Sequence, residues 1–254
     1  MALISRSKSR SVSVPAPVGG WNARDSLADM APQDAAQMTN FFPLTTEVML
    51  RNGYTQFSTG ITGQVESLLP YFSGSTSKLF AVASGAFYDI TSGGAVGASV
   101  VSGKTNSRWN YTNIATAGGN FLYTANGVDK PLLYDGATWT VIDAASTPAI
   151  TGVTTTTLKS PIVFKNRVFF IGKDTLKTWY LPSVSIGGAA NPIDVSSVAQ
   201  RGGYIVAHCT WTIDAGTGVD DYYVIATSQG EVIVYQGTDP SSSTTWALKG
   251  VWAL

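Results

Sequence analysis

Residues 121–134 read FLYTANGVDKPLLY, and this stretch decides the fold. A run of strand-forming residues, Phe121–Thr124, is followed by the turn-forming pair Asn126-Gly127 and then by a second such run, Pro131–Tyr134. An Asn-Gly pair supplies the positive backbone φ angles that tight hairpin turns need. The stretch therefore predicts an antiparallel β-hairpin.

The same arrangement recurs along the chain. Three further hairpins are predicted from the paired runs 79–83 with 86–90, 168–171 with 178–181, and 223–226 with 232–235. The four units are spaced 43, 46 and 55 residues apart, counted from Leu79, Leu122, Val168 and Tyr223. This spacing is typical of a four-stranded propeller blade, which takes about 40–50 residues.

A further β-prone run precedes three of the hairpins, at 65–72, 109–115 and 205–213. One antiparallel sheet cannot bury both of its faces alone, whereas sheets arranged around an axis bury them against their neighbours. We therefore predict a mainly β fold, a β-propeller-like array of antiparallel hairpin blades with an N-terminal extended arm and one short helix. About four blades are visible, the minimum for a closed ring, and a β-sandwich or mixed β-barrel would accommodate the same hairpins.

Three segments are predicted: a flexible basic arm (1–20), a docking block (21–59) and the propeller (60–254). Within the block, Pro32 suits the first position of a helix and Asp34 its positive end, so we expect a short helix near residues 32–39. The last residues, 246–254, form a β-rich run without a polar tail. We expect either that this strand closes a ring with N-terminal chain or that the propeller is incomplete here.

Composition and charge exclude several classes of function. The 254 residues carry 16 basic and 16 acidic side chains, and only 13% of residues are charged while 44% are hydrophobic. This balance argues against a disordered chain and against dedicated binding of nucleic acid. A single cysteine and a single histidine exclude a disulfide framework within the chain and a multi-histidine metal centre. The sequence has neither a membrane-length apolar stretch nor the apolar core of a signal peptide.

The candidate catalytic groups are better explained by structure. His208 and Cys209 are neighbours in a predicted strand, so they point to opposite faces and cannot form a dyad; we expect a strand histidine and a buried cysteine. Asp220 and Asp221 are adjacent acids that a turn explains. The glycine pairs lack the Lys-Ser/Thr of a phosphate-binding loop. We therefore predict no catalytic residues, no metal and no cofactor.

The aromatic residues are numerous, with seven Trp, eleven Tyr and ten Phe. We expect most of them to form the core between blades, although stacking on sugars or bases is the alternative function for such rings. The segment Asp135–Trp139, DGATW, is similar to the Asp-box turn of sialidase-like propellers but lacks its spacing residue. We interpret it as a hairpin turn whose Trp139 packs between sheets.

A family resemblance rests on the N-terminal motifs GGWNARD (19–25), NFFP (40–43) and RNGY (51–54). With Met30, Pro32 and Ala35 between them, these motifs resemble the N-terminal signature of tail nozzle proteins of short-tailed bacteriophages, also called tail tubular protein B or packaged-DNA stabilisation proteins. The following β-repeats are similar to the propeller of that family, so the resemblance spans about residues 18–254.

The resemblance implies a structural, non-enzymatic component of the virion tail, made in the host bacterial cytoplasm. It implies a homo-oligomeric ring, usually of six copies, which extends the DNA ejection channel below the portal and helps to retain packaged DNA. The implied partners are a head–tail adaptor and tail fibre, needle or plug proteins, with genomic DNA passing through without specific binding and with no membrane. A neutral Ser/Thr/Gly surface fits such a conduit, because each Lys or Arg on a phosphate strengthens DNA binding.

Eight residues are predicted to dock onto partners. Their side chains are basic or aromatic: Arg6, Lys8, Arg10, Trp21, Arg24, Phe41, Phe42 and Tyr54. We expect the arm to order only on assembly and the aromatic residues to anchor the block on the propeller or on the next subunit; a solvated terminus is the plain alternative for the arm. Two other functions stay open, namely a tail propeller that binds or degrades host surface polysaccharide and an unrelated interaction or sensor propeller.

Overall fold

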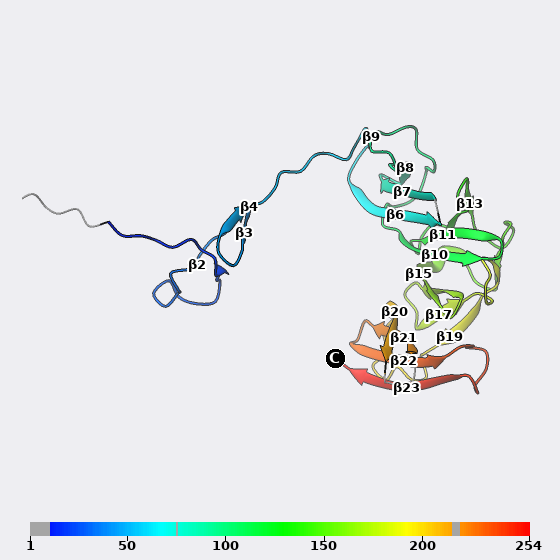
Figure 1. The fold of residues 1–254 in the computed structure, drawn as a ribbon. Helices are drawn as coiled ribbons and strands as arrows, with labels where there is room; N and C mark the ends of the chain where they lie inside the picture. Colours follow the sequence, from blue (N-terminus) through cyan, green and yellow to red (C-terminus); the bar gives the residue numbers. More distant parts are fainter. Residues whose placement is uncertain (1–10, 75, 215–218) are drawn as a thin grey trace, which may run out of the picture. The chain divides into compact units, whose positions relative to one another are not determined.

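The structure, a computed structural model, describes residues 11–74, 76–214 and 219–254. The chain divides into two compact units, Met1–Gln56 and Phe57–Leu254. Figure 1 shows strands joined by turns and loops in both units. Helical structure in the described residues is limited to one turn of 3-10 helix, η1 (Thr155–Thr157).

The second unit contains four antiparallel sheets that follow one another in chain order (Figure 1). The first has three strands, β6 (Val65–Ser73), β7 (Thr76–Ala83) and β8 (Ala86–Asp89). The second has β10 (Asn110–Thr116), β11 (Gly119–Ala125), β12 (Leu132–Tyr134) and β13 (Trp139–Val141).

The third and fourth sheets repeat the four-stranded pattern. The third has β15 (Leu158–Phe164), β16 (Arg167–Gly172), β17 (Lys177–Tyr180) and β19 (Asn191–Asp194). The fourth has β20 (Ile205–Asp214), β21 (Val219–Thr227), β22 (Glu231–Gly237) and β23 (Trp246–Ala253). Two short parallel pairs connect loops, β5 (Ser58–Thr59) with β9 (Gly94–Ala95) and β14 (Ile150–Thr151) with β18 (Gly188–Ala189).

All four predicted hairpins form. Two of their turns show how nearby residues stabilise them. Ser84 and Gly85 join β7 to β8 with φ angles of 48° and 72°, the two positive values that a tight hairpin turn requires. After β11 the connection is longer than a two-residue turn. There the Asn126 side-chain carbonyl accepts hydrogen bonds from the backbone N–H groups of Val128 and Asp129, at 3.0 and 2.8 Å, and so stabilises the loop.

Three hydrophobic clusters hold the four sheets together, one between each consecutive pair. The first and second sheets share Leu69, Tyr71, Phe80, Val82, Phe87, Trp109, Leu122, Leu132 and Tyr134. The second and third sheets share a cluster that includes Tyr123, Leu133, Val168 and Phe170. The third and fourth share one that includes Phe169, Tyr180, Tyr223, Ile233 and Tyr235.

This serial packing is that of a β-propeller-like array and not of a two-layer sandwich, because each middle sheet buries both faces against different neighbours. The aromatic residues contribute to all three interfaces, as expected from the sequence. Ring centroids lie 5.0 Å apart for Tyr71 and Tyr134, 5.5 Å apart for Tyr123 and Phe170, and 4.8 Å apart for Phe169 and Tyr223. Edge-to-face and tilted contacts at these distances add to the free energy gained by burial.

The first unit, in its described part, has two small sheets. Strands β1 (Gly20–Trp21) and β2 (Asp34–Ala35) pair in parallel, and β3 (Phe41–Pro43) forms an antiparallel hairpin with β4 (Val48–Leu50). The short helix predicted near residues 32–39 is therefore wrong. The backbone of this segment pairs with residues 19–22 instead: the N–H of Gly19 donates to the carbonyl of Gln33, and that of Asn22 to Ala35.

Candidate functional site

The candidate site is the first unit, because its apolar side chains lie at the surface. Between residues 11 and 56, Gly20 is the one buried residue. Among the predicted docking residues, Trp21 is 68% exposed, Tyr54 is 86% exposed, and about half of the surface of Phe41 and of Phe42 is exposed. The structure thus places all four aromatic residues where they can contact a partner.

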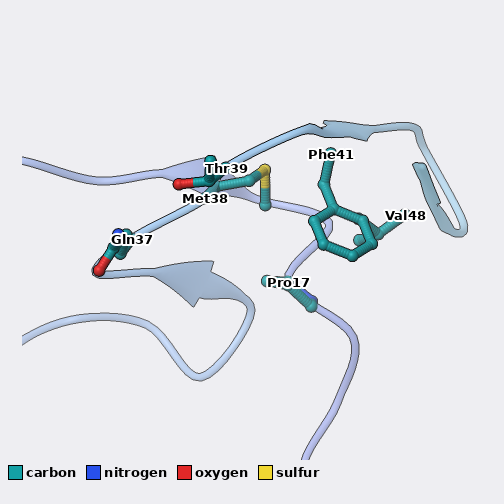
Figure 2. A pocket seen from close by; sticks show the side chains of 6 residues that line it. All are labelled: Pro17, Gln37, Met38, Thr39, Phe41 and Val48. Carbon is teal, nitrogen blue, oxygen red and sulfur yellow. The ribbon is translucent and has the colours of Figure 1, made fainter. Parts of the chain in front are cut away.

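These residues do not form one continuous patch. Phe41 and Phe42 are neighbours in β3, so their rings point to opposite faces of the small hairpin. Phe41 lines a shallow pocket of about 490 Å³ together with Pro17, Gln37, Met38, Thr39 and Val48 (Figure 2). Trp21 and Arg24 line a separate hollow beside β1, and Tyr54 lies under the Arg51 guanidinium, 6.0 Å from the ring centre.

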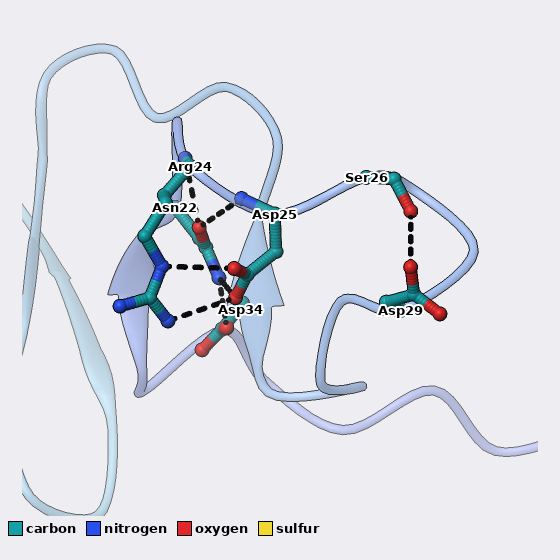
Figure 3. Close-up of polar contacts among 6 residues, drawn as sticks. All are labelled: Asn22, Arg24, Asp25, Ser26, Asp29 and Asp34. Carbon is teal, nitrogen blue, oxygen red and sulfur yellow. Dashed lines mark hydrogen bonds and ion pairs between the residues drawn. The ribbon is translucent and has the colours of Figure 1, made fainter.

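A cluster of polar contacts fixes the loop between β1 and β2 (Figure 3). The Asn22 amide nitrogen donates to the carboxylates of Asp25 and Asp34, at 2.9 and 2.8 Å. The Asn22 carbonyl oxygen accepts hydrogen bonds from the backbone N–H groups of Arg24 and Asp25, both at 3.1 Å. One side chain thus holds both ends of the loop and fixes the backbone at Arg24.

Arg24 is exposed but already paired within the chain. Its guanidinium donates to the Asp25 carboxylate at 2.9 and 3.3 Å. This pairing raises the pKa of Arg24, while the Arg24 guanidinium and then the Asn22 amide lower the pKa of Asp25. A partner would therefore meet an ion pair at this position and not an isolated positive charge. Arg6, Lys8 and Arg10 lie outside the described residues.

Two of the candidate catalytic groups in the second unit, His208 and Asp221, have structural roles. His208 is buried in β20, and both of its ring nitrogens are engaged, Nδ1 with the Tyr223 hydroxyl at 2.7 Å and Nε2 with the Ser160 carbonyl at 2.5 Å. Since the carbonyl can only accept, Nε2 carries the proton and Nδ1 accepts from Tyr223. Burial lowers the pKa of His208 to about 4, so the ring is neutral near pH 7.

Cys209 is exposed, so the prediction of a buried cysteine is wrong, whereas the opposite orientation of its neighbour His208 is confirmed. Asp221 forms an ion pair with Lys165 and accepts a hydrogen bond from the Thr212 hydroxyl at 2.8 Å. The side chain of Asp220 lies outside the described part of the chain. Within that part, no three His, Cys, Asp or Glu side chains come together as a metal-binding group, and no helix is long and apolar enough to span a membrane.

The turn at Asp135 matches its interpretation from sequence. The Asp135 carboxylate accepts backbone hydrogen bonds from Ala137 and Thr138 at 2.8 and 2.7 Å, which lowers its pKa. Trp139 then packs against Phe80, Phe87 and Tyr134, with ring centroids 5.0–5.3 Å away. These contacts make the segment part of the first interface between sheets.

One surface was missed by the sequence reasoning. Trp211 and Trp252 lie on the face of the fourth sheet that points away from the third, and they are 55% and 52% exposed, whereas most aromatic residues were expected in the core. The alternation of side chains along β20 and β23 could have placed them on one face. That this face has no neighbouring sheet among the described residues could not be read from the sequence.

Comparisons with known proteins show a likeness to a solved structure. No family model matches the chain, and no curated protein matches it. A solved structure that matches is BBS1N, crystallised in complex with ARL6DN and soaked with mercury, at 14% sequence identity and a TM-score of 0.46. The aligned region covers 79% of this chain and 58% of the matched chain, so this chain spans less than two thirds of that protein's length.

These findings correct the predicted function. BBS1N is a β-propeller domain and not a phage tail nozzle, and neither of the other comparisons supplies a phage relative. The tail-nozzle function drawn from the motifs at residues 19–54 is therefore wrong on these comparisons and is not retained. The resemblance of the motifs themselves is tested by none of the comparisons and stays a prediction.

Proposed function

We propose that this protein is a non-catalytic scaffold that assembles with further copies of itself, with residues 11–56 as the segment that docks. The observation that carries this proposal is the composition of the surface of the first unit. Its large exposed apolar residues are Val12, Val14, Trp21, Leu27, Phe41, Phe42, Leu44, Met49, Leu50 and Tyr54.

Energetics favour docking for such a segment. Ordering a residue's backbone costs about 1–2 kcal/mol, and burial of a large apolar side chain returns about 1.5–3 kcal/mol. A segment that buries one glycine recovers little of that free energy by itself. Contact of its aromatic residues with another protein surface would supply the missing burial.

Charge favours a second copy as the partner. The chain has a formal net charge of zero, with 16 basic and 16 acidic side chains, and few of its residues are charged. Identical copies therefore experience little mutual repulsion, which is the term that keeps strongly charged proteins apart. A non-catalytic role is supported by the candidate reactive groups, because His208 and Asp221 are occupied by hydrogen bonds and an ion pair.

Sedimentation velocity of the full chain over a wide range of concentrations tests this function. We expect reversible oligomers for the unmodified protein. A quadruple variant, Trp21→Ser with Phe41→Ser, Phe42→Ser and Tyr54→Ser, should be shifted to smaller species while the second unit stays folded. Thr45→Ser is the matched control, because Thr45 is exposed in the same unit but is not one of the large apolar residues of its surface. A protein that is monomeric at all concentrations, or a quadruple variant that assembles like the unmodified chain, would refute the proposal.

A further inference from the structure

The fourth sheet has an apolar outer face. Its core side packs on the third sheet through Tyr223, Ile225 and Ile233. Residues that alternate with these point to the other side: Cys209 pairs across the sheet with Val224, and Val224 with Val234. We call this side the last face; Trp211, Tyr222, Val232, Val234, Lys249, Trp252 and Leu254 line a shallow, mostly apolar hollow of about 610 Å³ on it.

The first sheet has a corresponding outer face. Its core side, Leu69, Tyr71 and Phe80, packs on the second sheet. The alternating residues of β6 therefore point away from that core, and two of them, Leu68 and Phe72, are 52% and 59% exposed. Leu68 pairs with Ala81, which pairs with Tyr88, so these side chains share what we call the first face.

The two faces resemble the interfaces that already exist inside the chain. Each pair of consecutive sheets packs through aromatic and aliphatic side chains from both partners, as Tyr123 does with Phe170. The first face and the last face carry the same kinds of side chain, yet neither contributes to the three clusters among the described residues. The last face is hollowed between its tryptophans, whereas Phe72 is exposed on the first face. Leu68 is exposed on the first face too and also lines a hollow with residues of β10, β15 and β20.

We propose that the last face of one copy packs against the first face of a second copy, which continues the serial packing of sheets from one chain into the next. This inference rests on the proposed self-association but uses a different surface from residues 11–56. The contact is head-to-tail, since two different patches meet. Trp211 and Trp252 would be its anchors, because buried tryptophans dominate the free energy of many protein interfaces.

Cys209 provides a direct test, because its exposed thiol lies on the last face. Leu68→Cys and Phe72→Cys, made separately in the full chain, would place a second thiol on the first face. Under mild oxidation we expect at least one of them to form disulfide-linked multimers, while the unmodified protein stays uncrosslinked. Adding Cys209→Ser to the crosslinking variant should abolish the multimers. Val141→Cys, an exposed position on β13 outside both faces, is the matched control and should not crosslink.

Two results would overturn the inference. Crosslinking of the unmodified protein through Cys209 would mean that two last faces meet symmetrically. Absence of multimers from both cysteine variants would mean that the first face is not the partner. A second measurement does not depend on thiol geometry: Trp252→Lys should abolish the sheet-mediated association in sedimentation, and Val141→Lys should not.

The crosslinking and sedimentation results also distinguish failure of the head-to-tail contact from failure of the proposed self-association. If the unmodified protein assembles but Trp252→Lys assembles equally well and neither cysteine variant crosslinks, the head-to-tail contact is refuted and self-association through the first unit stands. If the unmodified protein is monomeric at all concentrations, the proposed function fails, and the head-to-tail contact fails with it.

Discussion

The two units of this chain use apolar residues in opposite ways. In residues 57–254 three hydrophobic clusters join four sheets in series, and side chains such as Phe169, Tyr123 and Leu122 are fully buried. In residues 11–56 all four aromatic side chains, Trp21, Phe41, Phe42 and Tyr54, lie exposed, and Gly20 is the one buried residue. The same residue types therefore stabilise a fold in one unit and present a surface in the other.

What separates the two cases is whether a second layer of strands is available within the unit itself. Hairpins of the second unit recur at similar spacing, so each sheet meets another of the same kind. In its described residues, 11–56, the first unit has only the pairs β1–β2 and β3–β4, which are too small to cover one another's side chains. Repetition, and not hydrophobicity alone, therefore determines where a core forms.

The largest effect on stability is expected when a phenylalanine from each unit is replaced by alanine. Phe169→Ala should lower the free energy of unfolding by about 3–5 kcal/mol, because the ring is fully buried among Phe164, Tyr180, Tyr223 and Trp246. Phe42→Ala, whose ring is half-exposed, should change it by less than about 0.5 kcal/mol. Urea unfolding of the two full-length variants below the concentration of assembly measures both. Equal changes in the free energy of unfolding for the two variants would contradict the view that aromatic residues stabilise the fold in the second unit but not in the first.

Much of the fold could be predicted from sequence because its signals are local. The strands β7, β11, β16 and β21 are compact runs of aromatic and β-branched residues next to turn formers, and all four are confirmed. Strand β15 was missed. Its sequence LKSPIVF contains a proline and polar residues, and its pairing with β16 is interrupted between Lys159 and Ile162, where Ser160 has a φ of 51°. An irregular strand of this kind is stabilised by its neighbours and leaves little local signal.

The candidate site was less predictable, because it depends on which face lacks a neighbour. Residue type could not distinguish Trp109, buried between the first two sheets, from Trp211 on the exposed last face. The predicted helix failed for a related reason. Pro32 and Asp34 are good helix-starting residues, but the Asp34 carboxylate is bound by Asn22, twelve residues earlier. A contact of that range is not encoded in any local window.

Protonation of the buried His208 provides a second test of the core of the second unit. His208 is the chain's single histidine, and its pKa falls from an ordinary value of 6.5 to about 4 on burial. Between these values the unfolded chain binds a proton that the native protein does not, so stability is unaffected by this group above pH 6.5 and decreases as pH falls toward 4. The full loss is roughly 3 kcal/mol.

Chemical denaturation at a series of pH values between 6.5 and 4.5 measures this effect, since Asp and Glu side chains mostly titrate lower. His208→Gln should remove most of the pH dependence in this window. Cys209→Ser is the control, because it changes the adjacent residue on the opposite face and should retain the dependence. If the His208→Gln protein still loses stability steeply between pH 6.5 and 4.5, the pH dependence arises from another titratable group.

The smallest expected effect concerns the first unit alone. Asn22→Ala removes the amide that bridges Asp25 and Asp34 and the carbonyl that accepts from the N–H groups of Arg24 and Asp25. We expect amide hydrogen exchange at these two N–H groups to accelerate by roughly five- to tenfold, or about 1 kcal/mol, with no change in the unfolding of residues 57–254. Ser26→Ala, which removes only the hydrogen bond to Asp29, should leave both amides as they were. If Asn22→Ala instead destabilised the second unit, the two units would share their stability, and the exposed aromatic residues of the first would need an explanation within the chain and not in a partner.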